Sequence, residues 1–501
     1  MISFEEFCQV ASDYNAVPLL RTLLADIHTP VSAYLALRQE GVPSFLFESV
    51  EPNEKIGRYS FIGTGPSMLV RSSGGTVTVE VRGTVEKVSR SLPDTLDRLS
   101  RSYRQAPIAG LQGLPGGFVG YMGYDIVRDL ENTTLPEGNG SVEDEALFGL
   151  FPSILHFDHR TQRMTIVHNI LVDPGRPLRE QYDEGRKAVD VLELQLRRSV
   201  VPTSSFRCEP DGAEDATDRE HYCHAVRRAK EYIREGDIFQ VVLSRRVFRR
   251  FWGDPFPLYR ALRMINPSPY LFFLDFGETR LIGSSPEVLA RARGGVVEVL
   301  PIAGTRRRGE DEAEDKRLEQ ELLVDEKELA EHVMLVDLGR NDVGRISEYG
   351  AVEVPVFKRV ERYSHVMHLV SEVRGRLRPS ASAVEVLAAC FPAGTVSGAP
   401  KVRAMEIISE LEGTRRGAYA GAVGYVGFDG SLDTCIAIRT IVAHGDTLKI
   451  QAGAGIVADS VPEREFEETE SKSRALLQAV EVAARGLSSS AFEPSVMGHR
   501  Q

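Results

Sequence analysis

The order of the predicted strands and helices constrains the fold of this chain more than any other feature of its sequence. Short segments rich in β-forming residues, such as 44–49 and 76–81, follow one another between glycine-bearing turns. The grouping returns beyond residue 238, where several strands in a row precede a long charged helix at about 310–334. Strands that alternate singly with helices form doubly wound parallel sheets, whereas strands in runs favour mixed architectures. The sequence therefore predicts the α+β class.

The segment 199–218 is rich in Ser, Pro, Asp and Glu and shows little periodicity, which is typical of a linker. A length of 501 residues is compatible with two large domains or with about three of average size. We therefore predict an N-terminal domain over residues 1–200, a second domain over 201–486 and a disordered tail over 487–501.

Composition argues against several classes of function. The net charge of −12 disfavours nucleic acid or an anionic membrane as the main partner. The five cysteines are scattered and odd in number, which suggests reduced thiols in a cytoplasmic protein. No apolar run approaches the roughly 18 residues of a membrane span, and the first residues are acidic where a signal peptide is basic.

Two charged helices carry candidate metal ligands. Glu465, Glu468 and Lys472 recur at spacings of three and four and share one helical face. Glu331 stands near the end of the helix predicted at 310–334, beside an apolar stretch where a carboxylate needs a partner. A Mg²⁺ ion shared between Glu331 and Glu468 would provide one, because Mg²⁺ takes a few carboxylates together with ligand oxygens and water. A solvated acidic face is the commoner explanation of such spacing.

Three further residues have more than one interpretation. Gln240 lies on an alternating strand, where its side chain either lines an interior or faces solvent. His368 suits proton transfer near neutrality, although a hydrogen-bonded core histidine is the commoner case. Arg439 lies among β-forming residues, where a buried guanidinium needs a carboxylate from the protein or from a ligand. Segments 394–401 and 453–458 match phosphate-loop and dinucleotide fingerprints only in part, and we reject nucleotide binding at both.

Four segments together resemble the chorismate-utilising enzymes, and within them the large subunits of anthranilate synthase: 301–306, 331–342, 391–401 and 451–472. The N-terminal part of the chain matches more loosely. The resemblance implies an anthranilate-synthase-like β-sandwich core with helices packed on its outer faces. It also implies an enzyme that converts chorismate and ammonia to anthranilate and pyruvate, the first committed step of L-tryptophan biosynthesis.

The resemblance also implies roles for individual residues. Glu331 and Glu468 would ligate Mg²⁺, with Glu465 as a water-mediated neighbour. Glu287 would be the general acid for the departing ring hydroxyl, so its pKa must be raised. His368 would act in the elimination of pyruvate. The residues implied to bind the substrate or to flank the site are Thr395, Gln240, Gly304, Thr305, Tyr419, Arg439, Gly453, Ala454, Gly455 and Lys472.

Two positions distinguish the members of this family. Isochorismate and salicylate synthases place a water-activating lysine where Gln240 stands, and a neutral amide cannot be a general base. Aminodeoxychorismate synthases carry a nucleophilic lysine where Ala303 stands, and alanine cannot form that covalent adduct. Both positions favour ammonia as the nucleophile and anthranilate as the product. Aminodeoxychorismate synthase and isochorismate synthase stay the alternative enzymes. The alternative that is not an enzyme is an idle homologue that binds chorismate or tryptophan as a regulator.

Two partners are implied as well. The chain shows no Cys–His–Glu amidotransferase pattern, so a separate glutamine amidotransferase subunit is expected to supply ammonia, in a heterotetramer of two large and two small subunits. L-Tryptophan is the expected feedback inhibitor, bound where segment 46–49 meets segment 266–271. Phe47 and Leu271 replace a usual leucine and methionine, which leaves the strength of inhibition open. Two ordinary strands that meet between domains are the simpler explanation. The expected inhibitor contacts are Glu48, Ser49, Pro269, Tyr270 and Leu271.

Overall fold

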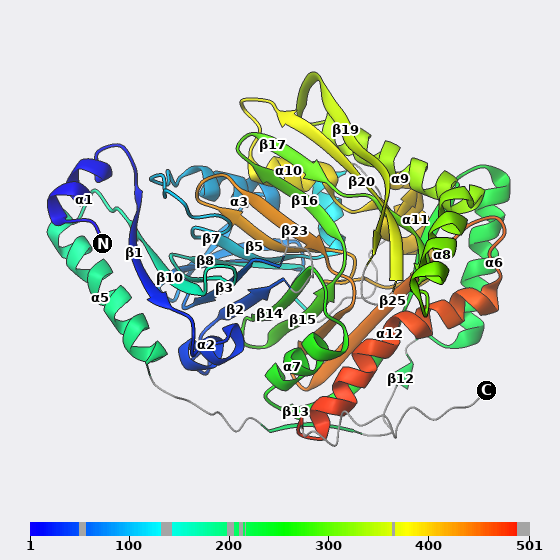
Figure 1. Ribbon diagram of the computed structural model, residues 1–501, viewed down its shortest axis with the longest axis horizontal. Helices are drawn as coiled ribbons and strands as arrows, with labels where there is room; N and C mark the ends of the chain where they lie inside the picture. The colour runs from blue at the N-terminus through cyan, green and yellow to red at the C-terminus, as the bar shows by residue number, and fades with distance from the viewer. Residues whose placement is uncertain are drawn as a thin grey trace.

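The computed structural model describes residues 1–49, 57–131, 143–197, 205–209, 214–215, 217–362 and 366–487. It confirms the α+β class, with two large antiparallel sheets and helices packed against them (Figure 1). Most of the predicted linker, and the predicted tail beyond residue 487, lie outside the described residues. None of the described helices is long and apolar enough to cross a membrane.

The first sheet has thirteen strands. Its order is β1 (Ala16–Leu24), β10 (Arg163–Leu171), β9 (Ser153–Asp158), β3 (Tyr59–Thr64), β2 (Ser44–Glu48), β14 (Tyr270–Asp275), β15 (Thr279–Ser285), β24 (Thr440–His444), β25 (Thr447–Ile456), β13 (Gln240–Gly253) and β11 (Phe206–Cys208). The short strands β12 (Glu214–Asp215) and β21 (Gly398–Ala399) also pair with β13.

The second sheet has twelve strands. Its order is β18 (Ile302–Arg307), β20 (Val366–Leu377), β17 (Val296–Val299), β16 (Val288–Arg293), β23 (Leu432–Ile436), β22 (Ala422–Gly427), β7 (Gly117–Met122), β8 (Ala146–Phe151), β4 (Met68–Ser73), β5 (Thr76–Val81) and β6 (Thr84–Val88). The long strand β19 (Ser347–Arg362) pairs with the free side of β20.

The two sheets pack face to face and enclose one hydrophobic layer. Each strand that borders this layer alternates, so that every second residue points into it. In β23, Asp433 and Cys435 face the space between the sheets, while Leu432 and Ile436 face the outer side. The layer includes Phe45, Val119, Tyr121, Leu147, Phe151, Phe272, Leu281, Val423, Cys435 and Val442. The predicted β-sandwich core is therefore present.

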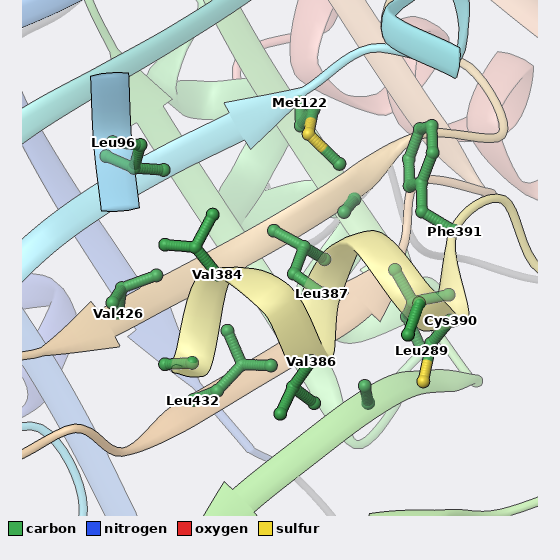
Figure 2. Close-up of a cluster of buried hydrophobic side chains, with 14 of the residues drawn as sticks. Leu96, Met122, Leu289, Val384, Val386, Leu387, Cys390, Phe391, Val426 and Leu432 are labelled. Atoms are coloured by element: carbon green, nitrogen blue, oxygen red, sulfur yellow. The ribbon is translucent and has the colours of Figure 1, made fainter. Parts of the chain in front are cut away.

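Helices cover the outer faces of both sheets, as predicted. The first sheet is covered by α1 (Phe4–Ala11), α2 (Pro30–Leu37), α5 (Leu178–Leu196), α7 (Phe256–Ile265) and α12 (Pro462–Ala484). The second is covered by α3 (Leu92–Arg101), α9 (Glu326–Gly344) and α10 (Ala383–Cys390). Figure 2 shows α10 seated on this face, with Val384, Leu387 and Cys390 near Met122, Val426 and Leu432.

The remaining helices lie at the edges of the sheets or between strands. Two of them, α6 (Arg219–Glu235) and α11 (Lys401–Glu412), pack beside the start of β13, and α8 (Glu312–Val324) packs on β20. The short helical segments are η1 (Tyr124–Ile126), α4 (Val127–Leu130) and η2 (Gly394–Val396).

Strands from both sides of residue 200 share both sheets. In the first sheet β2 pairs with β14, and in the second β7 pairs with β22 (Figure 1). The two predicted domains are thus joined by continuous hydrogen-bonded sheets, and their division stays a prediction.

The single helix predicted at 310–334 is wrong in its extent. The chain breaks at Asp325, whose carboxylate caps α9 by accepting from the amides of Lys327 and Glu328. The second helix then continues to Gly344. Glu331 therefore lies in the second turn of α9 and not at a helix end.

Candidate active site

Two neighbouring crossovers carry the chain from one sheet to the other and hold the centre of the site. Glu287 lies between β15 of the first sheet and β16 of the second, and Arg439 lies between β23 and β24. The amide of Ile436 donates to the carbonyl oxygen of Glu287 at 3.0 Å, and the amide of Ser284 donates to that of Arg439 at 3.1 Å. These main-chain bonds fix the two functional side chains relative to each other.

Glu287 is placed to serve as an acid. Burial raises the pKa of its carboxyl group, while a hydrogen bond from Thr395 and the positive charges of Lys472 and Arg439 offset part of that rise. The Thr395 hydroxyl, on η2, donates to Oε2 of Glu287 at 2.9 Å. A carboxyl group whose pKa is raised by burial can stay protonated long enough to give its proton to a leaving group.

Arg439 is a half-buried cation held in a strained conformation. Its φ of +51° lies in the left-handed region, which costs a residue other than glycine about 1–3 kcal/mol. Burial lowers the pKa of its guanidinium, and Nη1 donates to the carbonyl oxygen of Lys472. No carboxylate in the described part of the chain forms an ion pair with it. The site therefore offers a positive group to an anionic ligand, as the sequence suggested.

Lys472 lies at the meeting point of the predicted residues. Its Nζ is 2.7 Å from Oε1 of Glu468, one helical turn earlier on α12, and 3.0 Å from the carbonyl oxygen of Gly453. Burial raises the pKa values of Glu287, Glu331 and Glu465, and the positive charge of Lys472 offsets part of each rise. One lysine of α12 thus lies near the general-acid candidate Glu287 and near the metal-ligand candidates of both α9 and its own helix.

The glycine-rich end of β25 forms a bare wall of the site. Strand β24 pairs with β25 only as far as Ile450, so residues 451–456 have no strand neighbour on that side in the described structure. A Cβ atom on Gly453 would lie 2.7 Å from the Tyr419 hydroxyl and 2.8 Å from the carbonyl oxygen of Leu243, so only glycine fits there. Burial raises the pKa of Tyr419 to about 12, which keeps its hydroxyl a neutral donor.

The predicted metal ligands lie on two helices, α9 and α12. Burial raises the pKa values of Glu331 and Glu465, and the charges of Glu328 and Glu468, respectively, raise them further. The Gln240 side chain is hydrogen-bonded to Glu331, while its Oε1 is buried and has no partner in the part of the chain that the structure describes. No three His, Cys, Asp or Glu side chains in the described ranges lie close enough together to hold a metal by themselves. A metal here would need oxygen atoms from a ligand or from water.

His368 and Thr305 lie opposite each other on β20 and β18. A bulge at Gly304, whose φ is +66°, shifts the strand register between Ala303 and Thr305. Nδ1 of His368 is 3.0 Å from the carbonyl oxygen of Gly304 and 3.0 Å from Oγ1 of Thr305. Because the carbonyl can only accept, Nδ1 carries the proton and Nε2 holds the lone pair. Burial lowers the pKa of the ring, so it is neutral and able to take a proton.

The structure therefore gathers the predicted site residues around the crossovers, β25 and the facing helices. Sequence reasoning missed the buried Ser284 and Ser285, which precede Glu287. It gave no role to Glu328 of α9, which lies one helical turn before Glu331 and whose charge raises the pKa values of both His368 and Glu331.

Apart from the site around Glu287 and Arg439, a cavity of about 280 Å³ lies between the two sheets. All five residues expected to contact an inhibitor line it: Glu48, Ser49, Pro269, Tyr270 and Leu271. Oγ of Ser49 is buried and has no hydrogen-bond partner among the described residues, whereas Glu48 accepts from Tyr259 at 2.6 Å and from Arg263 at 3.0 and 3.2 Å. Ser49 can therefore bind a ligand more readily than Glu48.

Two polar residues of this cavity were not predicted. The Tyr270 hydroxyl donates to Asp433 at 2.6 Å, and Nε of Arg291 lies 2.9 Å from the same hydroxyl. Tyr270 belongs to the first sheet, and Arg291 and Asp433 belong to the second. The cavity is thus bridged by a hydrogen-bonded contact between the sheets.

Comparison with known proteins adds an independent observation. The chorismate binding enzyme family matches residues 42–478. Anthranilate synthase component 1 of Aquifex aeolicus is 45% identical over 488 residues, and the match covers 96% of this chain and 98% of the relative. Anthranilate synthase component 1 of Pseudomonas aeruginosa is 45% identical over 494 residues, and the match covers 96% of this chain and 99% of the relative. The crystal structure of anthranilate synthase component I from Streptococcus pneumoniae superposes with a TM-score of 0.74 at 35% identity, covering 91% of this chain and 98% of that one. The menaquinone-specific isochorismate synthase of Escherichia coli shares the fold, with a TM-score of 0.70 at 21% identity and coverage of 95% and 98%.

Proposed function

The chain belongs to the chorismate binding enzyme family, and we propose that it converts chorismate to anthranilate as component I of an anthranilate synthase. One observation carries the proposal: Glu287, a half-buried carboxyl group with a raised pKa, and Arg439, a half-buried arginine that forms no ion pair with a carboxylate among the described residues, lie on adjacent crossovers beside Lys472. Chorismate has two carboxylates and a ring hydroxyl that must leave, so it requires cations and an acid in one place. Formation of anthranilate by the purified chain from chorismate and ammonium tests the proposal.

We propose that the substrate supplies the carboxylate that binds to Arg439 and Tyr419. Arg439 and the neutral Tyr419 hydroxyl would bind the enolpyruvyl carboxylate, with the amides of Gly453, Ala454 and Gly455 along the open side of β25. Lys472 adds a further positive charge at the same wall. The ring is then held with its leaving hydroxyl toward Glu287, which donates the proton as the carbon–oxygen bond breaks.

Mg²⁺ is the proposed cofactor, held by Glu331 and Glu468 with Glu465 reaching it through water. The donor set fits, because carboxylates and water are the ligands that Mg²⁺ prefers. Burial leaves Glu331 and Glu465 with raised pKa values, which a nearby cation would lower. When bound, Mg²⁺ would neutralise and orient a substrate carboxylate.

The nucleophile is proposed to be ammonia. Gln240 donates to Glu331 and offers only an amide oxygen on its other side, so it can accept a hydrogen bond but cannot deprotonate water. Ala303, on β18, cannot form a covalent adduct. His368 would then take the proton from the ring carbon, and the electrons left behind would expel pyruvate and form the aromatic ring.

A separate amidotransferase is proposed to generate the ammonia, within a heterotetramer of two large and two small subunits. Burial raises the pKa values of Cys223, Cys390 and Cys435, and of the half-buried Cys208, which makes these thiols poor nucleophiles. The relatives are themselves named as component 1, and this supports a second component.

L-Tryptophan is the proposed inhibitor in the 280 Å³ cavity between the sheets. The aromatic and apolar lining from Phe47, Phe61 and Tyr425 suits an indole ring. The unpartnered Ser49 hydroxyl suits its ammonium group, and Arg291 lies in the wall for its carboxylate. Binding of tryptophan that is lost when this cavity is filled by a larger side chain would support the assignment.

A further inference from the structure

The cavity between the sheets and the catalytic centre are built from the same strands. Its walls come from β2, β3 and β14 of the first sheet and from β16, β22 and β23 of the second. Two of these strands lead directly to functional residues. Asp433 and Cys435 of β23 line the cavity, and the chain leaves this strand after Ile436 and reaches Arg439 three residues later. The general-acid candidate Glu287 precedes β16 immediately.

Strand β15 links the cavity to both crossovers. It pairs with β14, and two of the cavity's lining residues, Tyr270 and Leu271, stand opposite Ser285 and Ser284 in the ladder. Both serines are fully buried. Glu287 lies only two residues beyond Ser285, so a single strand, β15, separates β14 from the acid.

Ser284 connects the cavity's loop with Arg439. Its hydroxyl donates to the carbonyl oxygen of Asn266 and lies 2.8 Å from the Ser268 hydroxyl, in the loop that leads into Pro269. Its amide donates to the carbonyl oxygen of Arg439 at 3.1 Å. Ser284 thus contacts the loop before Pro269 with its side chain and the strained Arg439 with its main chain.

Ser285 connects the two crossovers. Its hydroxyl donates to the carbonyl oxygen of Ile436 at 2.7 Å and lies 3.4 Å from the amide of Glu287. The amide of Ile436 returns a bond to the carbonyl oxygen of Glu287 at 3.0 Å. The Ser285 hydroxyl thus adds a second connection between Glu287 and the start of the crossover that carries Arg439.

We propose that Ser284 and Ser285 are positioning residues that hold Arg439 and Glu287 for catalysis and couple them to ligand binding in the cavity between the sheets. The inference rests on the proposed function, in which that ligand is tryptophan. A ligand between the sheets sets their separation, and the crossovers that carry Glu287 and Arg439 span that separation. The ligand therefore favours one arrangement of the crossovers, and chorismate favours another.

Such coupling is reciprocal, so it can be measured without turnover. The experiment determines the dissociation constant of L-tryptophan by equilibrium dialysis, with and without saturating chorismate and with ammonia and glutamine omitted. The wild-type protein is expected to bind tryptophan about 5–150-fold more weakly when chorismate is bound, the usual range for allosteric coupling. In Ser284→Ala and Ser285→Ala this ratio is expected to fall to within about twofold of one, while tryptophan still binds.

Two controls separate coupling from general destabilisation. Ser347→Ala removes another buried serine hydroxyl, which donates to the carbonyl oxygen of Val343 at 2.8 Å away from the cavity, and it should keep the wild-type ratio. Ser285→Thr retains the hydroxyl and should keep most of the coupling. Melting temperatures of all variants show whether each is folded.

The outcomes are distinct. Wild-type coupling in both alanine variants, or loss of coupling in Ser347→Ala as well, would overturn the role of the two serines. If the wild type binds tryptophan with the same dissociation constant with and without chorismate, the coupling is overturned and the inhibitor site is retained. Failure of tryptophan to bind at all would overturn the inhibitor assignment together with the coupling, and anthranilate formation would remain a separate question.

Discussion

The hydroxyl of Thr395 lies 2.9 Å from Oε2 of Glu287, and it donates a hydrogen bond that stabilises the ionised form of a carboxyl group whose pKa burial has raised. The two effects oppose each other. Burial favours the protonated acid needed for the departure of the ring hydroxyl, and Thr395 limits how far the pKa rises. The pair therefore determines the pH range in which the acid is available.

Replacing Thr395 by valine is expected to raise the pKa of Glu287 further, because the ionised carboxylate loses a donor. Activity requires protonated Glu287 and falls as pH rises through its pKa, so the alkaline limb of the profile should move to higher pH. The measurement is kcat/KM for chorismate against pH at a constant concentration of unprotonated ammonia. Thr395→Ser keeps the donor and should keep the wild-type limb. A shift to lower pH in the valine variant would contradict the assignment.

Glu468→Gln should weaken the binding of Mg²⁺ by more than about 100-fold. Loss of a residue that only contacts a metal ligand weakens metal binding by about 10–100-fold, and loss of a direct ligand should weaken it more. The charge is lost while the shape of the side chain is kept, so the melting temperature without metal should stay close to that of the wild type. Calorimetric titration of Mg²⁺ into protein with bound chorismate, without ammonia, measures the affinity. Glu470→Gln, exposed on the same helix, is the matched control. Equal Mg²⁺ affinity in the two variants would remove Glu468 from the metal site.

His368→Met should separate the two half-reactions. Amination of the ring depends on Glu287 and the substrate-binding cations, but loss of the ring proton depends on Nε2 of His368. We expect pyruvate release to fall about 10²–10⁴-fold, the usual contribution of a general base, while an aminated intermediate accumulates. Chromatography of quenched reactions measures both species. His444→Gln changes a histidine on β24 that contacts Thr279 and should behave as the wild type. Anthranilate formation by His368→Met at the wild-type rate would exclude the base role.

Ser49→Ala should weaken tryptophan binding about 10–100-fold, because a hydrogen bond to a charged group contributes about 1.5–3 kcal/mol. The hydroxyl oxygen is buried and has no partner within the described structure, so it is available to the ligand. Equilibrium dialysis gives the dissociation constant. Ser44→Ala, at the start of the strand β2 that ends just before Ser49, removes a buried hydroxyl that faces Tyr34 and should leave tryptophan affinity unchanged. Equal affinities for both variants would place the ligand elsewhere.

The sequence predicted the fold class better than it predicted the individual helices and strands. Strands in runs correctly indicated α+β, because alternation of burial is a local property of each strand. The sequence did not indicate strand β1, which occupies Ala16–Leu24. Its partner β10 lies more than a hundred residues away, and pairing over such distances leaves no local signal.

The relations between site residues also depend on distant contacts. Glu331, Glu465, Glu468 and Lys472 could be grouped by helical spacing and by family resemblance. The pairing of Ser285 with Tyr270, which joins the cavity to the catalytic centre, follows from strand register and could not be predicted. The same holds for the contact between Tyr270 and Asp433, which forms only because the two sheets face each other.

The most direct test of the central claim is product analysis of the purified chain with chorismate, Mg²⁺ and ammonium at mildly alkaline pH. Anthranilate and pyruvate in equal amounts, both absent when Mg²⁺ is chelated, are the predicted result. Aminodeoxychorismate or isochorismate in place of anthranilate would contradict the roles given to Ala303 and Gln240. Binding of chorismate or tryptophan without any product would show a regulator and not an enzyme.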